Sequence, residues 1–232
     1  MHRALSFALL LAPLLACTAE ADPPDLAALY RDAVADAAIA EANEIVDDLV
    51  AIRPDNPSLL RDEAGRVLLV TWTNYSGYDD LVGQPTKLGV EVWTTVAPQL
   101  QEFCRAAEPR DAALELRMEQ LLGLPAGTGK DRLVELWVPA EAVFRPSPDP
   151  EIDDSVAALD YPPGTAQSHI DWIEALKAAS YGEDGYPWTR LGYTYDWSGE
   201  GSEVGLSEFV IAAGSEVIVN GVFSVAEYCA AK

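Results

Sequence analysis

The chain has 232 residues, of which 49% are hydrophobic and 23% are charged, close to the average for globular proteins. This length suits one large domain or two small ones, and the composition excludes a disordered chain, a collagen-like fibre and a cysteine-rich miniprotein. The 38 acidic residues outnumber the 15 lysines and arginines, which gives a formal net charge of −23. Such a surface repels phosphate backbones, so we expect no nucleic-acid partner.

The first seventeen residues have the pattern of an export signal. Arg3 supplies a positive charge, and the apolar run 4–16 that follows is too short to cross a bilayer as a helix. The run ends in Leu14-Leu15-Ala16-Cys17, which resembles the lipobox of bacterial lipoproteins. The resemblance implies that residues 1–16 are a signal peptide, that Cys17 carries lipid, and that residues 17–24 are a tether. It implies an exported protein anchored at the periplasmic or outer surface of the bacterial cell envelope.

A second cleavage site leaves another outcome open. Ala19-Glu20-Ala21 also fits the small-residue pattern at which signal peptides are cut. Cleavage there would remove Cys17 and release a soluble protein. We favour the anchor, because a cysteine directly after a small residue at the end of the apolar run is otherwise hard to explain.

The remaining cysteines predict a disulfide bond. If Cys17 carries lipid, Cys104 and Cys229 are left, and an even number in an exported protein favours pairing. The alternative is that they are two separate buried thiols. Two isolated cysteines and one distant histidine lack the spacing of a metal site.

The first element expected after the tether is a long helix from Asp25 to about Ile52. Apolar residues recur there at steps of three and four, as on one helical face. They are Leu26, Tyr30, Val34, Ala38, Ala42, Ile45, Leu49 and Ile52. Pro54 should end the helix, because the residue before a proline avoids the α conformation. The apolar face needs a partner, so we expect this helix to dock on the core.

The middle of the chain alternates between expected strands and helices. A hairpin is predicted from residues 59–61 to a strand over 67–73, which is apolar on both faces and therefore central. Further strands are expected over 88–96 and 133–138. Pro98 suits the first turn of a helix in which Cys104 faces inward, and a second helix is expected over 111–122.

The C-terminal part begins with a proline-rich, irregular segment, 145–164. A helix over 169–179 follows, with Ser168 as its expected N-cap. A strand over 188–197 and a hairpin of 206–212 with 216–222 complete the prediction. Helices and strands mix without regular alternation, which indicates an α+β fold. We expect residues 25–232 to form a single compact domain with a mixed or antiparallel sheet and flanking helices.

Four carboxylates in the irregular segment suggest a calcium site. They are Asp149, Glu151, Asp153 and Asp154, and oxygen ligands on a flexible loop suit Ca²⁺. The segment lacks the EF-hand pattern, so the alternative is a solvated acidic loop. No other cofactor is indicated.

The densest cluster of aromatic residues lies on the predicted strand 188–197. Trp188, Tyr193, Tyr195 and Trp197 are the candidate ligand-binding residues, on which a sugar ring or a partner's side chain could stack. The alternative is that these rings belong to the core.

Candidate catalytic residues lie close to this strand. Glu208 falls between Leu206 and Val210 on one strand face, and burial there would raise the pKa of its carboxyl group. Arg190 is its expected partner. With Asp196 or Glu203 as a second carboxylate, Glu208 could act as a general acid, as in glycoside hydrolysis. His169, the only histidine after the signal, could serve as a base, with a surface or capping role as the alternative.

These features favour a domain that binds a ligand or an envelope protein. The alternatives are a secreted hydrolase or transferase that uses the carboxylates and Arg190, and a structural envelope protein without a pocket. A concave pocket lined by the aromatic strand would favour the first two.

Overall fold

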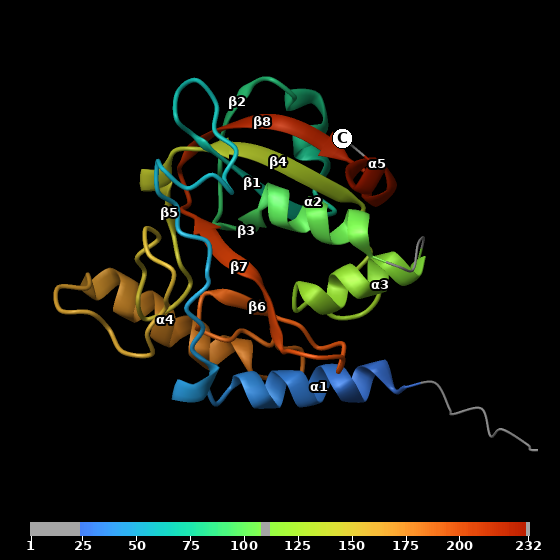
Figure 1. Cartoon of the computed structure of the whole chain (residues 1–232), viewed down its shortest axis with the longest axis vertical. Coiled ribbons are helices and arrows are strands. Elements are labelled where there is room, and N and C mark those ends of the chain that lie inside the picture. The colour runs from blue at the N-terminus through green and yellow to red at the C-terminus, as the bar shows by residue number, and fades with distance from the viewer. Residues whose placement is uncertain (1–23, 108–111, 231–232) are drawn as a thin grey trace, which may run out of the picture.

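The structure, a computed structural model, describes residues 24–107 and 112–230 of the chain (Figure 1). The signal peptide, Cys17 and most of the tether therefore lie outside the described residues. Within these residues, five α-helices and eight strands form an α+β fold, as predicted. The helices are α1 (Leu26–Ala37), α2 (Ala97–Ala106), α3 (Ala112–Leu121), α4 (Gln167–Ser180) and α5 (Val225–Ala230). No helix among the described residues has the length and apolar character needed to cross a membrane.

The eight strands form one antiparallel sheet. They are β1 (Val67–Thr73), β2 (Pro85–Lys87), β3 (Val92–Val96), β4 (Arg132–Val138), β5 (Val143–Phe144), β6 (Tyr193–Tyr195), β7 (Val204–Ile211) and β8 (Glu216–Phe223). Their order is β2-β8-β4-β1-β3-β7-β5, and β6 pairs separately with β7. The central position expected for β1 is confirmed, since it lies between β4 and β3. Short 3₁₀ helices occur at η1 (Ala42–Glu44), η2 (Ser76–Leu81) and η3 (Ala140–Ala142).

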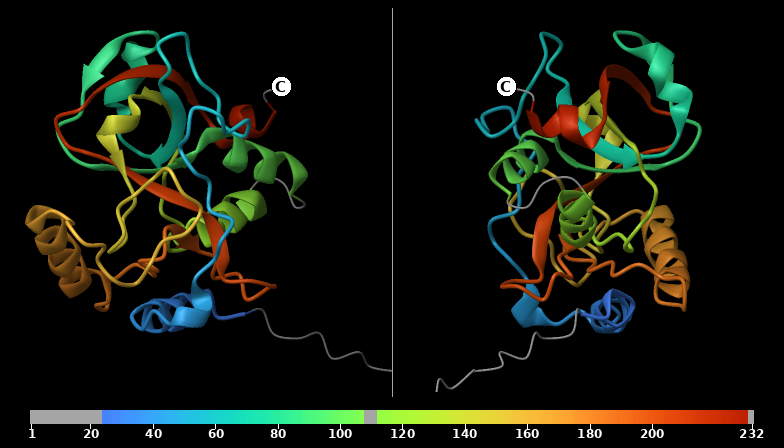
Figure 2. Two further views of the ribbon diagram at one scale, coloured as in Figure 1. Left: turned by 60° about the vertical axis from the view of Figure 1, so that its left-hand side comes forward. Right: turned by 90° about the vertical axis from the view of Figure 1, so that its right-hand side faces the viewer.

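The two faces of the sheet carry separate apolar clusters. Alternate residues of β1 point to opposite sides, so Val67 and Leu69 join one cluster while Val70 and Trp72 join the other. Helices α2, α3 and α5 lie together beside the sheet, whereas α1 runs beneath β6 at the far end of the molecule (Figures 1 and 2).

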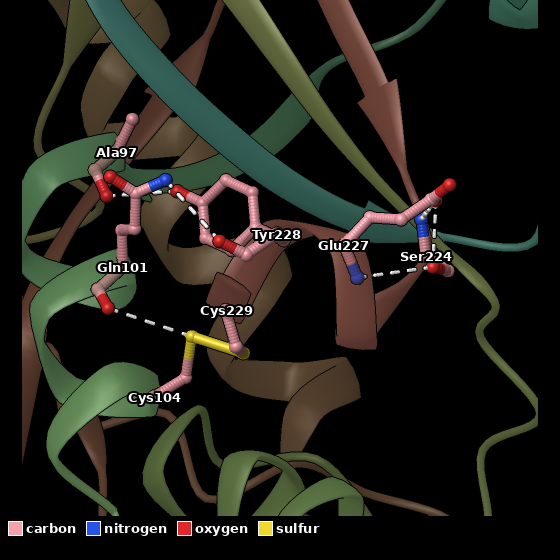
Figure 3. Close-up of a disulfide and its surroundings, with 7 residues drawn as sticks. All are labelled: Ala97, Gln101, Cys104, Ser224, Glu227, Tyr228 and Cys229. Atoms are coloured by element: carbon pink, nitrogen blue, oxygen red, sulfur yellow. Dashed lines mark hydrogen bonds between the residues drawn. A yellow bond between two sulfur atoms is a disulfide. The ribbon is translucent and has the colours of Figure 1, made fainter. Parts of the chain in front are cut away.

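The predicted disulfide bond is confirmed. Cys104 of α2 is bonded to Cys229 of α5, with 5.4 Å between their Cα atoms (Figure 3). Tyr228 strengthens the same contact, because its buried hydroxyl donates to the carbonyl of Ala97 at the start of α2. The C-terminus is thus tied to the middle of the chain.

The predicted length of the N-terminal helix is wrong. Asp25 caps α1 by accepting from the amides of Ala27 and Ala28, but the helix ends at Ala37. The segment that follows η1 is extended, because its amides find acceptors elsewhere. Leu49 donates to the carbonyl of Ser155, and Val50 donates to the hydroxyl of Ser207. These tertiary hydrogen bonds outweigh the helical periodicity.

The predicted hairpin of β7 and β8 is also wrong. The two strands are consecutive, yet β7 pairs with β3 and β5, whereas β8 pairs with β2 and β4. Leu88, just after β2, holds the connecting turn through hydrogen bonds with Gly214 and Ser215. The turn therefore directs β8 towards the opposite part of the sheet.

Several other predicted boundaries change. The hairpin expected at 59–73 is reduced to a single bridge between Arg61 and Val67. The strand predicted over 88–96 begins only at Val92, and that predicted over 188–197 is confined to β6. Ser168 is not the N-cap of α4; Ala166 holds that position, without a side-chain hydrogen bond.

Candidate functional site

A pocket of about 820 Å³ opens where two strands of the sheet separate. β1 and β3 pair only at Leu69–Val96 and Val70–Thr95. Beyond this point β1 continues to Thr73 and β3 runs back to Val92 without mutual hydrogen bonds, so the two strands diverge. Residues 70–73 and 92–95 both line the pocket. A cavity of this size is typical of small-molecule sites.

The floor of the pocket is a row of side chains across three strands. Val70 of β1 lies opposite Thr95 of β3, and Thr95 lies opposite Glu208 of β7. Residues that are directly opposite in antiparallel strands point to the same face, so these three side chains are neighbours. All three line the pocket, with Trp72 and Trp93 beside them.

Glu208 is the most unusual group on this floor. Enclosure by the surrounding apolar walls raises the pKa of its carboxyl group to about 8, although the residue retains some exposure. Among the described residues, the carboxyl group has no hydrogen-bond or ion-pair partner. The inward orientation and raised pKa expected from the sequence are confirmed, but the expected ion pair with Arg190 does not form.

Three tryptophans from separate elements form one cluster beside the pocket. Trp93 stacks on Trp172 of α4 with ring centroids 6.2 Å apart, and Trp188 meets both rings edge to face. The indole of Trp172 donates to Glu91 and that of Trp188 to the carbonyl of Pro146. Trp93 and Trp188 contribute to the pocket surface. The cluster fixes these rings in place, because each contacts two others.

The rim of the pocket is unusually apolar for a surface. Tyr75, Val90 and Tyr186 are more than half exposed and all line the opening. They come from the segment after β1, the β2–β3 connection and the segment after α4. Exposed apolar residues gathered around a concavity are typical of a binding site.

Lys130 provides a positive group on the pocket wall. It precedes β4, next to Asp131, whose amide donates to the carbonyl of Thr73. Partial burial lowers the pKa of the Lys130 ammonium group. Within the described chain, Lys130 and Glu208 form no ion pair with each other. The pocket thus contains an acidic and a basic side chain that do not neutralise each other.

The candidate ligand-binding residues divide between pocket and core. Trp188 lines the pocket. Tyr195 borders it too, but its ring is buried with Ala33 and Ala37 of α1 and its hydroxyl donates to Asp36. Tyr193 is buried in a cluster with Leu49, and its hydroxyl donates to the carbonyl of Glu44. Trp197 is buried against Tyr30 of α1, with ring centroids 5.4 Å apart.

The other candidate catalytic residues lie away from the pocket. Asp196 forms a bidentate ion pair with Arg117 of α3, with distances of 3.1 and 2.5 Å. Arg190 donates to the carbonyls of Ala37 and Ala38 at the end of α1. His169 donates from Nε2 to the carbonyl of Ser147 at 2.8 Å. Glu208 is the member of this group that the pocket contains.

The candidate calcium ligands do not form a group. Asp149 is buried and accepts from the amide of Ala158, and Asp154 contacts the buried guanidinium of Arg145. In the described ranges, one set of three acidic side chains has the spacing of a metal site, and it consists of Asp36, Glu44 and Glu203 on a different surface. These carboxylates could hold a cation, but exposed acidic groups often cluster without one.

Sequence reasoning missed several residues of the pocket, chiefly Trp72, Trp93 and Lys130. Both tryptophans stand in strongly apolar strands, where they resemble core residues. The separation of β1 from β3 gives them a surface, and no local pattern in either strand signals that separation. Of the two tyrosines after β1, Tyr78 is buried and Tyr75 is exposed. An exposed tyrosine in a polar loop was the one local signal.

Comparisons of the chain with protein-family models, with curated proteins and with solved structures find no match.

Proposed function

We propose that this protein is an exported, lipid-anchored domain that binds a small, largely apolar molecule in the pocket between β1 and β3. The pocket itself supports this proposal. Its floor is built from three strands, its wall from rigid tryptophans and its rim from exposed apolar side chains. Apolar side chains gathered around an opening are uncommon on surfaces that bind nothing, so these exposed groups support a ligand.

The walls favour binding over catalysis. Hydrolysis by two carboxylates needs both on the same side of a bound substrate. Asp196 and Arg190 are held in other interactions, and neither lines the pocket. Glu208 is therefore more readily understood as a group that recognises the ligand.

Binding can be tested with Nile red, a neutral apolar dye that fluoresces in a dry site. The wild-type protein should bind it with one site per chain. Thr71→Trp should weaken binding by roughly tenfold, because Thr71 lines the pocket and the larger ring would fill it. Val82→Trp is the matched control, since Val82 is exposed and lies outside the pocket. Equal affinity in the two variants would argue against the pocket as the binding site.

Export and anchoring are supported by the leader and by the disulfide bond. Disulfides persist in oxidising compartments, and the one between Cys104 and Cys229 suits a protein outside the cytoplasm. The full-length protein expressed in a bacterium should appear in the membrane fraction, and Cys17→Ser should move it to the soluble fraction. A mass spectrum of the wild type that shows an unmodified N-terminus at Asp22 would contradict the anchor.

A further inference from the structure

The unpaired carboxyl group of Glu208 indicates what kind of ligand the pocket suits. Two acidic residues line the pocket, and one of them, Glu91, already accepts a hydrogen bond from Trp172. Glu208 lies deeper, in the row with Val70 and Thr95. Its position brings a carboxyl group into apolar surroundings without the arginine or lysine that usually accompanies one.

We infer that the ligand is an apolar cation, an amine on an aromatic or aliphatic body, whose ammonium group pairs with the Glu208 carboxylate while its body lies against Trp93 and Trp188. This inference rests on the proposed binding function and adds the charge of the ligand to it.

The surroundings of Glu208 support a positive ligand in two ways. Indole rings attract cations to their faces, and Trp93 and Trp188 are held within the same wall. The whole chain has a formal net charge of −23, so its field concentrates cations near the opening and repels anions.

Two lysines represent the competing possibility. Lys87 and Lys130 line the same pocket and could bind an anion, although Lys87 is exposed. However, burial lowers the pKa of the Lys130 ammonium group, so the pocket disfavours its charged form relative to that of an exposed lysine. We therefore assign the recognition of charge to Glu208, and variants of Lys87 and Lys130 test the rival assignment.

Three indoles with the same ring and different charges test the inference. Tryptamine is a cation, tryptophol is neutral and indole-3-acetate is an anion, and each is measured by displacement of Nile red at pH 8.5. Tryptamine should bind at least roughly tenfold more tightly than the other two. Glu208→Gln should remove this preference while the affinity for tryptophol stays the same. Glu216→Gln, an equal charge change at an exposed residue outside the pocket, should keep it.

Proton release gives a second, independent readout. At pH 7 the Glu208 carboxyl group is mostly protonated, because its pKa is about 8. Pairing with an ammonium group requires the carboxylate, so tryptamine should release roughly one proton per molecule bound. Calorimetry in phosphate and in Tris measures this release, which should be absent in Glu208→Gln and for tryptophol.

The possible failures can be distinguished. Tightest binding of indole-3-acetate, lost in Lys130→Met or in Lys87→Met, would overturn the inference in favour of an anionic ligand. Equal affinities for the three indoles, or no proton release with tryptamine, would also overturn it. If Nile red binds but none of the indoles displaces it, the inference fails and the proposed binding function stands. If Nile red does not bind, the proposed function fails as well.

Discussion

Asp196 and Glu208 are acidic residues that lie only twelve positions apart, yet their surroundings differ completely. Asp196 is buried with a complete set of partners, two hydrogen bonds from Arg117 and one from the amide of Ser198. Glu208 has no such partners among the described residues and faces the pocket. The first arrangement stabilises the fold, whereas the second leaves a group available for binding.

The ion pair of Asp196 should therefore contribute strongly to stability. Asp196→Ala leaves the guanidinium of Arg117 partly buried without its partner and should lower the free energy of unfolding by about 3 kcal/mol. Urea denaturation measures this loss. Asp55→Ala is the control, because Asp55 pairs with Arg53 on the open surface and should cost less than about 1 kcal/mol. Similar losses in the two variants would show that Asp196 has no special role.

Glu208 should make the protein less stable as the pH rises. Its folded-state pKa of about 8 lies above the ordinary glutamate value of 4.5. Between these pH values the unfolded chain gives up its proton and the folded protein keeps it, so unfolding becomes more favourable with rising pH.

The measurement compares wild type with Glu208→Gln at pH 5 and pH 9. All other titrating groups cancel in this difference. From pH 5 to pH 9, the free energy of unfolding of the variant should rise by about 3 kcal/mol relative to that of the wild type. This value is below the full linkage value, because the pocket admits some water. A difference that does not change with pH would mean that the carboxyl group is well hydrated in the folded protein.

At the residue scale, the sequence predicted the burial of Glu208 but not its neighbours. Alternation along one strand was sufficient to place its side chain on an inner face. The expected partner, Arg190, instead lies on a left-handed backbone with φ of 61° and binds the carbonyls that end α1. Such a contact depends on where a distant helix docks, and strand alternation contains no information about that.

At the scale of elements, the strongly apolar strands were predictable and the N-terminal helix was not. β1 and β4 are apolar on both faces, so both boundaries were correct to within a residue. The apolar repeat that suggested a helix to Ile52 is real, but its later members pack elsewhere. Leu49, for example, is buried with Ala157 and Leu191. Periodicity shows that residues are buried and does not distinguish a helix from an extended segment that follows the core.

The disulfide bond between α2 and α5 should stabilise the folded protein. The disulfide joins residues 125 positions apart, and closing so long a loop restricts the unfolded chain. The double variant Cys104→Ala, Cys229→Ala should lower the free energy of unfolding by about 5 kcal/mol in the chain-entropy account. Urea denaturation of the variant and of reduced wild type should give the same loss. A loss below about 1 kcal/mol would mean that the contacts of Tyr228 already hold α5 in place.

At the scale of the whole molecule, the pocket arises from the topology of the sheet. Its walls come from β1, β3 and β7 and from the segments next to α3 and α4, which are far apart in the sequence. Sequence reasoning could identify single members such as Trp188 and Glu208. The cavity itself exists because β1 and β3 diverge after two paired positions. That divergence depends on pairing between strands that are far apart in the sequence.

The excess of negative charge is a property of the whole chain and should limit its stability at low salt. With 38 acidic and 15 basic residues, the compact state holds like charges closer together than the unfolded state does. Raising NaCl from 10 mM to 150 mM shortens the screening length from about 30 Å to about 8 Å. The free energy of unfolding should rise by on the order of 1 kcal/mol over this range. KCl should have the same effect, because screening depends on ionic strength. A fall in stability with added salt would mean that attractive pairs, such as Arg132 with Asp79 and Asp131, outweigh the repulsion.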